Sequence, residues 1–286
     1  MRLTCFLAAI PAALLLGSLH PETVPAAPPA DEPAPIKALL VCGGCCHDYE
    51  HQKHIIADGL AERAHIEVTV VHQGGTATDS KIALYENADW ARGYDIVIHD
   101  ECFSGVGDKE YVDRILKPHA EGLPAVALHC AMHSYRTGDD RWFEFLGVTS
   151  RRHGKAYGHE VLNVDATHPI MKDWGPAWQN PAGELYWIEK VWPSAHPLAT
   201  AKNQEKGNDE VCVWTNDYKK ARVFGTTLGH HNETVSDPKY LELLTNGVLW
   251  ACGKLEPKYL KAAGPRQVPV NVAEGKKATA SSEQSG

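Results

Sequence analysis

The sequence predicts an α/β fold in which helices cover both faces of a mostly parallel central sheet. Apolar runs of strand length are continuous rather than alternating, which is typical of strands buried on both faces. In the first half of the chain these runs alternate with segments of helical spacing, as in βαβ units. With 286 residues, 43% hydrophobic and 22% charged, the chain can bury such a core.

The first half contains the parallel strands. They are expected at 36–44, 65–75, 94–101 and 124–130. A helix over 51–63 follows the first strand, and a second helix over 108–122 precedes the fourth. Asp108 is the expected N-cap of that second helix, and Gly122 its stop.

The second half is more irregular and predicts antiparallel strands. Alternating residues within 157–170, 183–201 and 209–231 favour strands joined by turns. A closing helix is expected within 236–255, with Ser236 or Asp237 as N-cap and Gly253 just after its end.

The two ends of the chain have a different composition. Arg2, an apolar stretch and a Pro/Ala-rich segment predict a signal peptide and the start of a spacer over 1–27. The expected α/β domain spans 36–255, and 256–286 is a linker and tail. We therefore expect a secreted or periplasmic protein with no stable membrane span after cleavage; a retained amino-terminal anchor is the alternative.

The net charge and the histidine content limit the classes of binding partner that we expect. The net charge of −8 argues against a nucleic-acid surface, which is usually basic. Sixteen histidines favour a site built from imidazoles. The expected partner is a small molecule or an oligosaccharide, and the sequence leaves the oligomeric state open.

Polar residues follow several of the predicted strands. In an open α/β sheet, ligands bind beyond the carboxyl ends of the strands. His129 and His230 each follow an apolar strand, so each is a candidate acid/base or ligand, with a structural histidine as the alternative. Together with His47 and a carboxylate they would also suit a divalent metal such as zinc.

The motif His-Asp-Tyr-Glu-His at 47–51 matches the H-x-x-E-H zinc signature in letters. That signature requires both histidines on one formed helix, but His47 precedes the helix. We expect His47 to face the ligand, and His51 and His54 to lie on the solvated helix face.

The cysteines permit two readings. Cys42 and Cys45 have the spacing of a redox pair or half a zinc site, but buried unpaired cysteines are the favoured interpretation. Cys130 as a nucleophile would need a base and an electropositive pocket. We expect it to pack beneath the turn as a structural residue instead, and the sequence leaves the pairing of the cysteines open.

Glu184 precedes Tyr186 and Trp187, and a carboxylate beside aromatic rings is suited to sugars. The alternative is an ordinary loop glutamate. A glycosidase with paired carboxylates would need a second acid, from Asp100 or Glu101.

The segments LLVCGG, ALHCAMHSYR, RRHG, GELY and RVFGTTLGHH, within 36–255, resemble the trehalose-utilisation, ThuA-like family. The resemblance implies a flavodoxin-like fold related to class I glutamine amidotransferases, and action on disaccharides or keto-sugars. It places His129 where those amidotransferases carry their cysteine nucleophile, which implies that thiol chemistry has been lost. The implied pocket residues are His47, His129, His153, Glu184, Tyr186 and His230. Before the tyrosine of this loop the family often has Asp-Glu, whereas this sequence has Gly183-Glu184. The tail resembles the start of a discoidin-like domain.

These observations lead to one main hypothesis and two alternatives. The main hypothesis is a sugar-acting hydrolase, lyase or isomerase with His129, Glu184 and His230 as catalytic residues. Substrate-binding residues would be His47, His153, Tyr186 and Trp187. The alternatives are a non-catalytic carbohydrate-binding protein and a cysteine-dependent hydrolase or amidotransferase-like enzyme.

Overall fold

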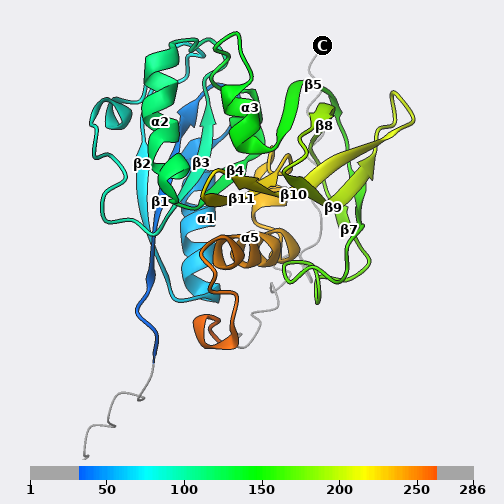
Figure 1. Ribbon diagram of the computed structural model, residues 1–286. Coiled ribbons are helices and arrows are strands. Elements are labelled where there is room, and N and C mark those ends of the chain that lie inside the picture. The colour runs from blue at the N-terminus through cyan, green and yellow to red at the C-terminus, as the bar shows by residue number, and fades with distance from the viewer. Residues whose placement is uncertain (1–31, 263–286) are drawn as a thin grey trace, which may run out of the picture. The chain divides into compact units, whose positions relative to one another are not determined.

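A nine-stranded mixed sheet forms the centre of the computed structural model, which describes residues 32–262 (Figure 1). Its strand order is β2-β1-β3-β4-β11-β10-β9-β6-β7. The strands of this sheet are β1 (Ile36–Gly44), β2 (Ile66–His72), β3 (Ile96–Cys102), β4 (Ala125–Leu128), β6 (His159–Asn163), β7 (Ala177–Asn180), β9 (Ala195–Lys202), β10 (Asp209–Tyr218) and β11 (Ala221–Thr226). The strands from β2 to β11 in this order pair in parallel, and those from β11 to β7 pair antiparallel. The predicted flavodoxin-like fold class is confirmed.

Helices cover both faces, as predicted. The helices are α1 (Tyr49–Arg63), α2 (Lys109–Glu121), α3 (Arg141–Leu146), α4 (Asn232–Val235) and α5 (Pro238–Ala251). Figure 1 shows α1 and α5 on one side of the sheet and α2 and α3 on the other. Leu60 of α1 and Leu244 of α5 enter one core cluster, whereas Ile115 of α2 and Trp142 of α3 enter a second. No helix within 32–262 is both long and apolar enough to cross a bilayer.

Capping residues set the helix ends where the sequence places them. The Asp108 carboxylate accepts the backbone N–H of Tyr111 at 3.1 Å, and Gly122 has a φ of 122°. For α5, the cap is Asp237 rather than Ser236, because the Asp237 carboxylate accepts the N–H of Lys239 at 2.7 Å. Helix α1 begins at Tyr49, two residues before the expected start.

The Gly-Gly at the tip of β1 allows a close backbone approach. Gly43 and Gly44 have φ values of 138° and 96°. A Cβ on Gly43 would lie 1.9 Å from the Gln73 carbonyl oxygen, and one on Gly44 would lie 2.2 Å from that of Cys102. Only glycine fits there, and the close approach brings the following residues to the edge of the sheet.

Two strands outside the main sheet complete the fold. Strands β5 (Val148–Ala156) and β8 (Glu184–Val191) pair antiparallel with each other, and His153 lies opposite Tyr186. The expected signal segment over 1–27 lies outside the described residues, as does most of the tail that resembles a discoidin-like domain.

Candidate functional site

Three predicted histidines meet beyond the carboxyl ends of the parallel strands. His47 follows β1, His129 follows β4 directly, and His230 follows β11. The Nδ1 atom of His230 lies 3.1 Å from Nε2 of His47 and 3.2 Å from Nε2 of His129. Parallel pairing of the strands produces this meeting, because their carboxyl ends share one edge of the sheet.

Backbone carbonyls orient two of these rings. Nδ1 of His129 lies 2.6 Å from the Thr227 carbonyl oxygen, so this nitrogen carries the proton and donates. Nδ1 of His47 lies 3.2 Å from the Cys45 carbonyl oxygen and from the Tyr49 hydroxyl. In the neutral rings both Nε2 atoms then direct a lone pair toward His230. The sequence did not reveal these orienting groups, because a backbone carbonyl carries no residue-type signal.

Glu184 and Tyr186, from β8, complete the cluster. The Glu184 carboxylate lies 3.2 Å from Nδ1 of His230, 3.8 Å from Nε2 of His129 and 3.5 Å from Nδ1 of His153. The Tyr186 hydroxyl lies 3.3 Å from Nε2 of His129. The Tyr186 ring also stacks on His133 at 4.0 Å between centroids, a contact that no motif had indicated.

Burial controls the charge of these groups. It lowers the pKa of His129 well below the ordinary value, and the nearby His47 lowers it further. Burial and then His230 lower the pKa of His47 to about 4. Burial alone would raise the pKa of Glu184, but hydrogen bonding to His230 and the neighbouring imidazoles bring it below its usual value. At neutral pH the site therefore holds neutral His47 and His129 beside an ionised Glu184.

His129 is held in an uncommon backbone conformation. Its φ of 39° lies in the left-handed region, which a non-glycine residue enters at a cost of about 1–3 kcal/mol. The Thr227 carbonyl and the β4–β11 pairing hold it there. Such strain is concentrated at functional sites.

The donor set fits a tetrahedral metal ion. Zn–N bonds of about 2.0–2.1 Å separate two nitrogen ligands by about 3.3 Å, close to the 3.1 and 3.2 Å found here. One ring nitrogen from each of His47, His129 and His230 falls in a group spanning at most 4.8 Å. Two lone pairs and a carboxylate at one point favour a shared cation.

Not every predicted site residue joins this cluster. His153 borders Glu184 but is exposed. Trp187 lies next to Tyr186 on β8, so it points to the other face, where Lys206 Nζ lies 3.8 Å from its ring centroid. It lines a separate pocket of about 550 Å³ with Arg136, Arg151, Arg152, Glu189 and Lys206.

The two candidates for a second carboxylate lie on opposite faces of β3. Glu101 accepts hydrogen bonds from the hydroxyls of Tyr85 at 3.0 Å and Tyr135 at 3.1 Å, and it pairs with His99 at 2.9 Å. Those contacts keep it in the buried core. Asp100 is buried as well, and its Oδ2 has no hydrogen-bond partner.

The cysteines correct one expectation. Disulfides join Cys45 to Cys46 and Cys102 to Cys130. The interpretation of Cys45 as a buried unpaired cysteine is wrong, because Cys45 is bonded to Cys46. Cys130 is buried after β4, where the end of β3 brings Cys102 to it. Cys42 is free and buried, so it does not pair with Cys45.

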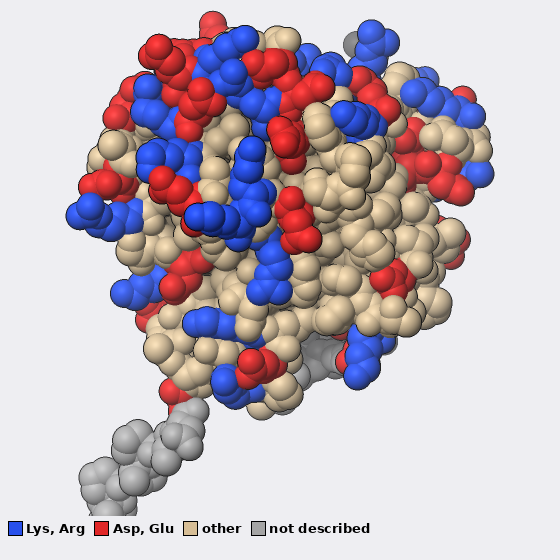
Figure 2. Space-filling model, in the orientation of Figure 1, with Lys and Arg blue, Asp and Glu red and all other residues tan. Residues whose placement is uncertain are grey.

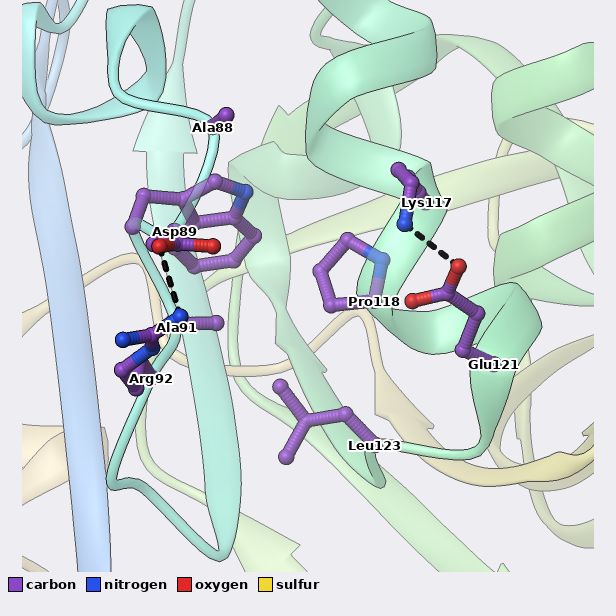
Figure 3. A pocket seen from close by; sticks show the side chains of 9 residues that line it. Ala88, Asp89, Ala91, Arg92, Lys117, Pro118, Glu121 and Leu123 are labelled. Atoms are coloured by element: carbon purple, nitrogen blue, oxygen red, sulfur yellow. Dashed lines mark hydrogen bonds and ion pairs between the residues drawn. The ribbon is translucent and has the colours of Figure 1, made fainter.

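A second hollow lies far from these groups. Figure 3 shows a pocket of about 380 Å³ between residues 88–92 and the end of α2. These segments lead into β3 and β4, so this pocket lies at the amino ends of the parallel strands, whereas the histidines lie beyond their carboxyl ends. Its charges are paired within it, Arg92 with Asp89 and Lys117 with Glu121. Figure 2 shows acidic and basic side chains interspersed over the upper left of one face.

Comparisons with known proteins agree with this architecture. A ThuA-like protein from Parabacteroides merdae aligns with a TM-score of 0.63 and 20% identity, covering 81% of this chain and 94% of its own. One from Bacteroides uniformis gives 0.60 and 18%, covering 79% and 95%. A cytoplasmic protein from Salmonella typhimurium gives 0.52 and 11%, covering 74% and 98%. At these identities the likeness shows the fold alone.

No curated protein matches the sequence. The ThuA family model, described as trehalose utilisation, matches residues 37–251. That span includes His47, His129, His230 and Glu184, which together are the His/Glu cluster. Because that match covers most of the chain, this protein belongs to the ThuA family.

Proposed function

We propose that this protein is an enzyme acting on a glycoside, a disaccharide or a keto-sugar at the cluster of His47, His129, His230 and Glu184. Membership of the trehalose-utilisation family supports a carbohydrate substrate. The observation that carries the proposal is the convergence of three imidazoles and one carboxylate: Nδ1 of His230 lies 3.1–3.2 Å from His47, His129 and Glu184, and Glu184 lies 3.8 Å from His129. Groups that accept and return protons at one point are what bond cleavage or isomerisation of a sugar requires.

The residues divide the chemistry according to their protonation. Glu184 is ionised, so it accepts a proton from a sugar hydroxyl or from a carbon next to a carbonyl. His230 is 3.2 Å away and returns a proton to the departing or newly formed oxygen. His129 cannot rotate, because the Thr227 carbonyl holds its Nδ1–H. His47 and His129 thus present two fixed lone pairs, and a divalent ion bound to them would polarise a carbonyl or a water.

Polar groups of Tyr186 and His153 beside the cluster are suited to sugar hydroxyls. Tyr186 presents its hydroxyl at 3.3 Å from His129 while its ring packs against His133. His153, at the exposed side of Glu184, is placed to contact a bound hydroxyl. We therefore assign these residues to substrate orientation rather than to proton transfer.

Two substitutions test the proposal on a panel of disaccharides and their keto forms, with and without added zinc. Glu184→Gln keeps the shape of the side chain and removes the base, so turnover should fall by about 100-fold or more. His129→Ala should fall at least as far, and His51→Ala is the matched control on the exposed helix face. Unchanged turnover in both site variants would contradict the proposal. Sugar binding without turnover would identify a carbohydrate-binding protein instead.

We also propose that the protein works outside the cytoplasm. The two disulfides support this, since such bonds persist in oxidising compartments. Amino-terminal sequencing of the exported protein tests it, and a mature chain that retains Arg2 in the membrane fraction would favour an anchor.

A further inference from the structure

We propose that Cys45, Cys46, Cys102 and Cys130 form a redox site in which two electrons from an external dithiol convert Cys46, at the surface, and Cys130, beside the His/Glu cluster, into thiols. The proposal is independent of the sugar chemistry above. It concerns thiol–disulfide exchange between two neighbouring disulfides within one chain.

The geometry places the two disulfides in contact. Sγ of Cys45 lies 3.6 Å from Sγ of Cys102, although the residues are 57 positions apart. Cys46 is exposed, whereas Cys102 and Cys130 are only 3% and 7% exposed. Solution reductants therefore reach the first bond and not the second, and exchange at the 3.6 Å contact is the direct route inward.

The Cys45–Cys46 bond has no evident structural purpose. A disulfide stabilises a fold mainly by closing a loop of the unfolded chain. Adjacent residues enclose no loop, whereas Cys102 and Cys130 are 28 positions apart. An exposed bond that closes no loop can be reduced and re-formed while the fold persists.

A buried carboxyl group, that of Asp100, shares a face of β3 with Cys102. Asp100 and Cys102 are two residues apart on β3 and therefore share one face, and Asp100 pairs in register with Cys42 of β1. Cys42, Cys102 and Cys130 pack in one cluster. Asp100 is 6% exposed, and its Oδ2 has no hydrogen-bond partner. Burial, and then the charge of Glu101, raise the pKa of Asp100, which keeps a proton available to departing thiolates.

The exchange has two balanced steps. A thiolate of the dithiol attacks Sγ of Cys46 and breaks its bond to Cys45, and the second thiol then releases Cys46, so the dithiol leaves as a disulfide. Two electrons and two protons now reside on Cys45 and Cys46. The Cys45 thiolate next attacks Sγ of Cys102, forming Cys45–Cys102 and breaking Cys102–Cys130. The electron pair goes to Cys130, which takes up the proton that Cys45 lost, with Asp100 as carrier.

The product places a free thiol at the functional site. A ring nitrogen of His47 and the sulfurs of Cys102 and Cys130 lie within 4.8 Å of one another. Cys130 also follows His129 directly in the chain. Reduction would therefore add a soft ligand next to the imidazoles and remove the crosslink behind His129.

Peptide mapping tests the proposal without an activity assay. The full-length protein is equilibrated with oxidised glutathione, treated with one equivalent of dithiothreitol, alkylated, and digested with trypsin under non-reducing conditions. Before reduction, peptide 93–109 should be linked to peptide 115–136. After reduction, it should be linked to peptide 38–53, with Cys46 and Cys130 alkylated.

Variants separate exchange from simple reduction. Cys45→Ser should abolish the new link, while Cys42→Ser should retain it and Cys252→Ser, outside the cluster, should leave it unchanged. Asp100→Asn should slow its formation by roughly 10-fold or more. The proposal fails if Cys45 and Cys46 become alkylated together while 93–109 stays linked to 115–136. It fails equally if the oxidised protein keeps four free thiols at these positions, for instance around a bound metal.

Discussion

Zinc should stabilise this protein through His129, and the size of the effect can be worked out from the site. Nitrogen separations of 3.1 and 3.2 Å match the roughly 3.3 Å of a tetrahedral ion, so the imidazoles need little rearrangement to bind it. A ligand present at 100 times its Kd stabilises the folded state by about 2.7 kcal/mol. For a chain of this size, each kcal/mol raises the Tm by about 2–4 °C. The expected rise is therefore about 5–11 °C.

His129→Ala should remove most of that rise, because it deletes one of the two carbonyl-fixed lone pairs. The assay is thermal unfolding with and without zinc, with titration calorimetry to set the concentration and the disulfides kept oxidised. His51→Ala is the control, since His51 is exposed and bonds Asp48 at 2.8 Å. An equal zinc effect in wild type and His129→Ala would place the ion elsewhere. Absence of any effect in the wild type at millimolar zinc would refute the metal-site reasoning.

Three further predictions concern stability. Asp108→Ala should lower the free energy of unfolding in urea by about 1 kcal/mol, because the N–H of Tyr111 loses its acceptor; no change would contradict the capping role. Replacing both Cys102 and Cys130 by Ser should cost about 3.6 kcal/mol for their 28-residue separation. The same change at Cys45 and Cys46 should cost far less, and equal costs would contradict the loop-closure argument. Burial and then His99 lower the pKa of His119 to about 3. Its contribution is complete above the ordinary pKa near 6.5 and falls by about 1.4 kcal/mol per pH unit as pH drops toward 3. His119→Gln should reduce the slope of unfolding free energy between pH 7 and pH 5, and an unchanged slope would disprove it.

The sequence predicts those site residues that follow the parallel strands. His47, His129 and His230 each follow an apolar run, and parallel strands bring such positions to one edge. Glu184 and Tyr186 enter through β8, which lies outside the main sheet, and only the family resemblance indicated that they would join. Trp187 was misassigned because composition alone groups it with Tyr186 as one aromatic patch. Neighbouring residues of a strand point to opposite faces, so Trp187 points away from the cluster that Tyr186 joins.

The cysteine pairs were beyond the reach of sequence reasoning for a related physical reason. Spacing suggested Cys42 and Cys45, but Cys45 bonds to its neighbour Cys46 and Cys42 stays free, although both pack in one cluster with Cys102 and Cys130. Cys102 and Cys130 are joined because β3 and β4 are neighbours in the sheet, and a sheet order is not encoded in the distance between two cysteines along the chain.

The register between β4 and β11 determines the geometry of the site. Leu128 pairs with Thr226, so the next residues, His129 and Thr227, face each other at the edge, and the Thr227 carbonyl fixes the His129 ring. The same strand end continues to His230, so one segment supplies both the orienting carbonyl and the third imidazole. A slip of one residue would shift these groups by about 3.3 Å along the strand, more than the 2.6 Å hydrogen bond that holds the ring. In many sites a carboxylate orients the histidine ring; here the pairing of two buried strands orients His129 instead. His129 can therefore keep its strained conformation only while that pairing holds.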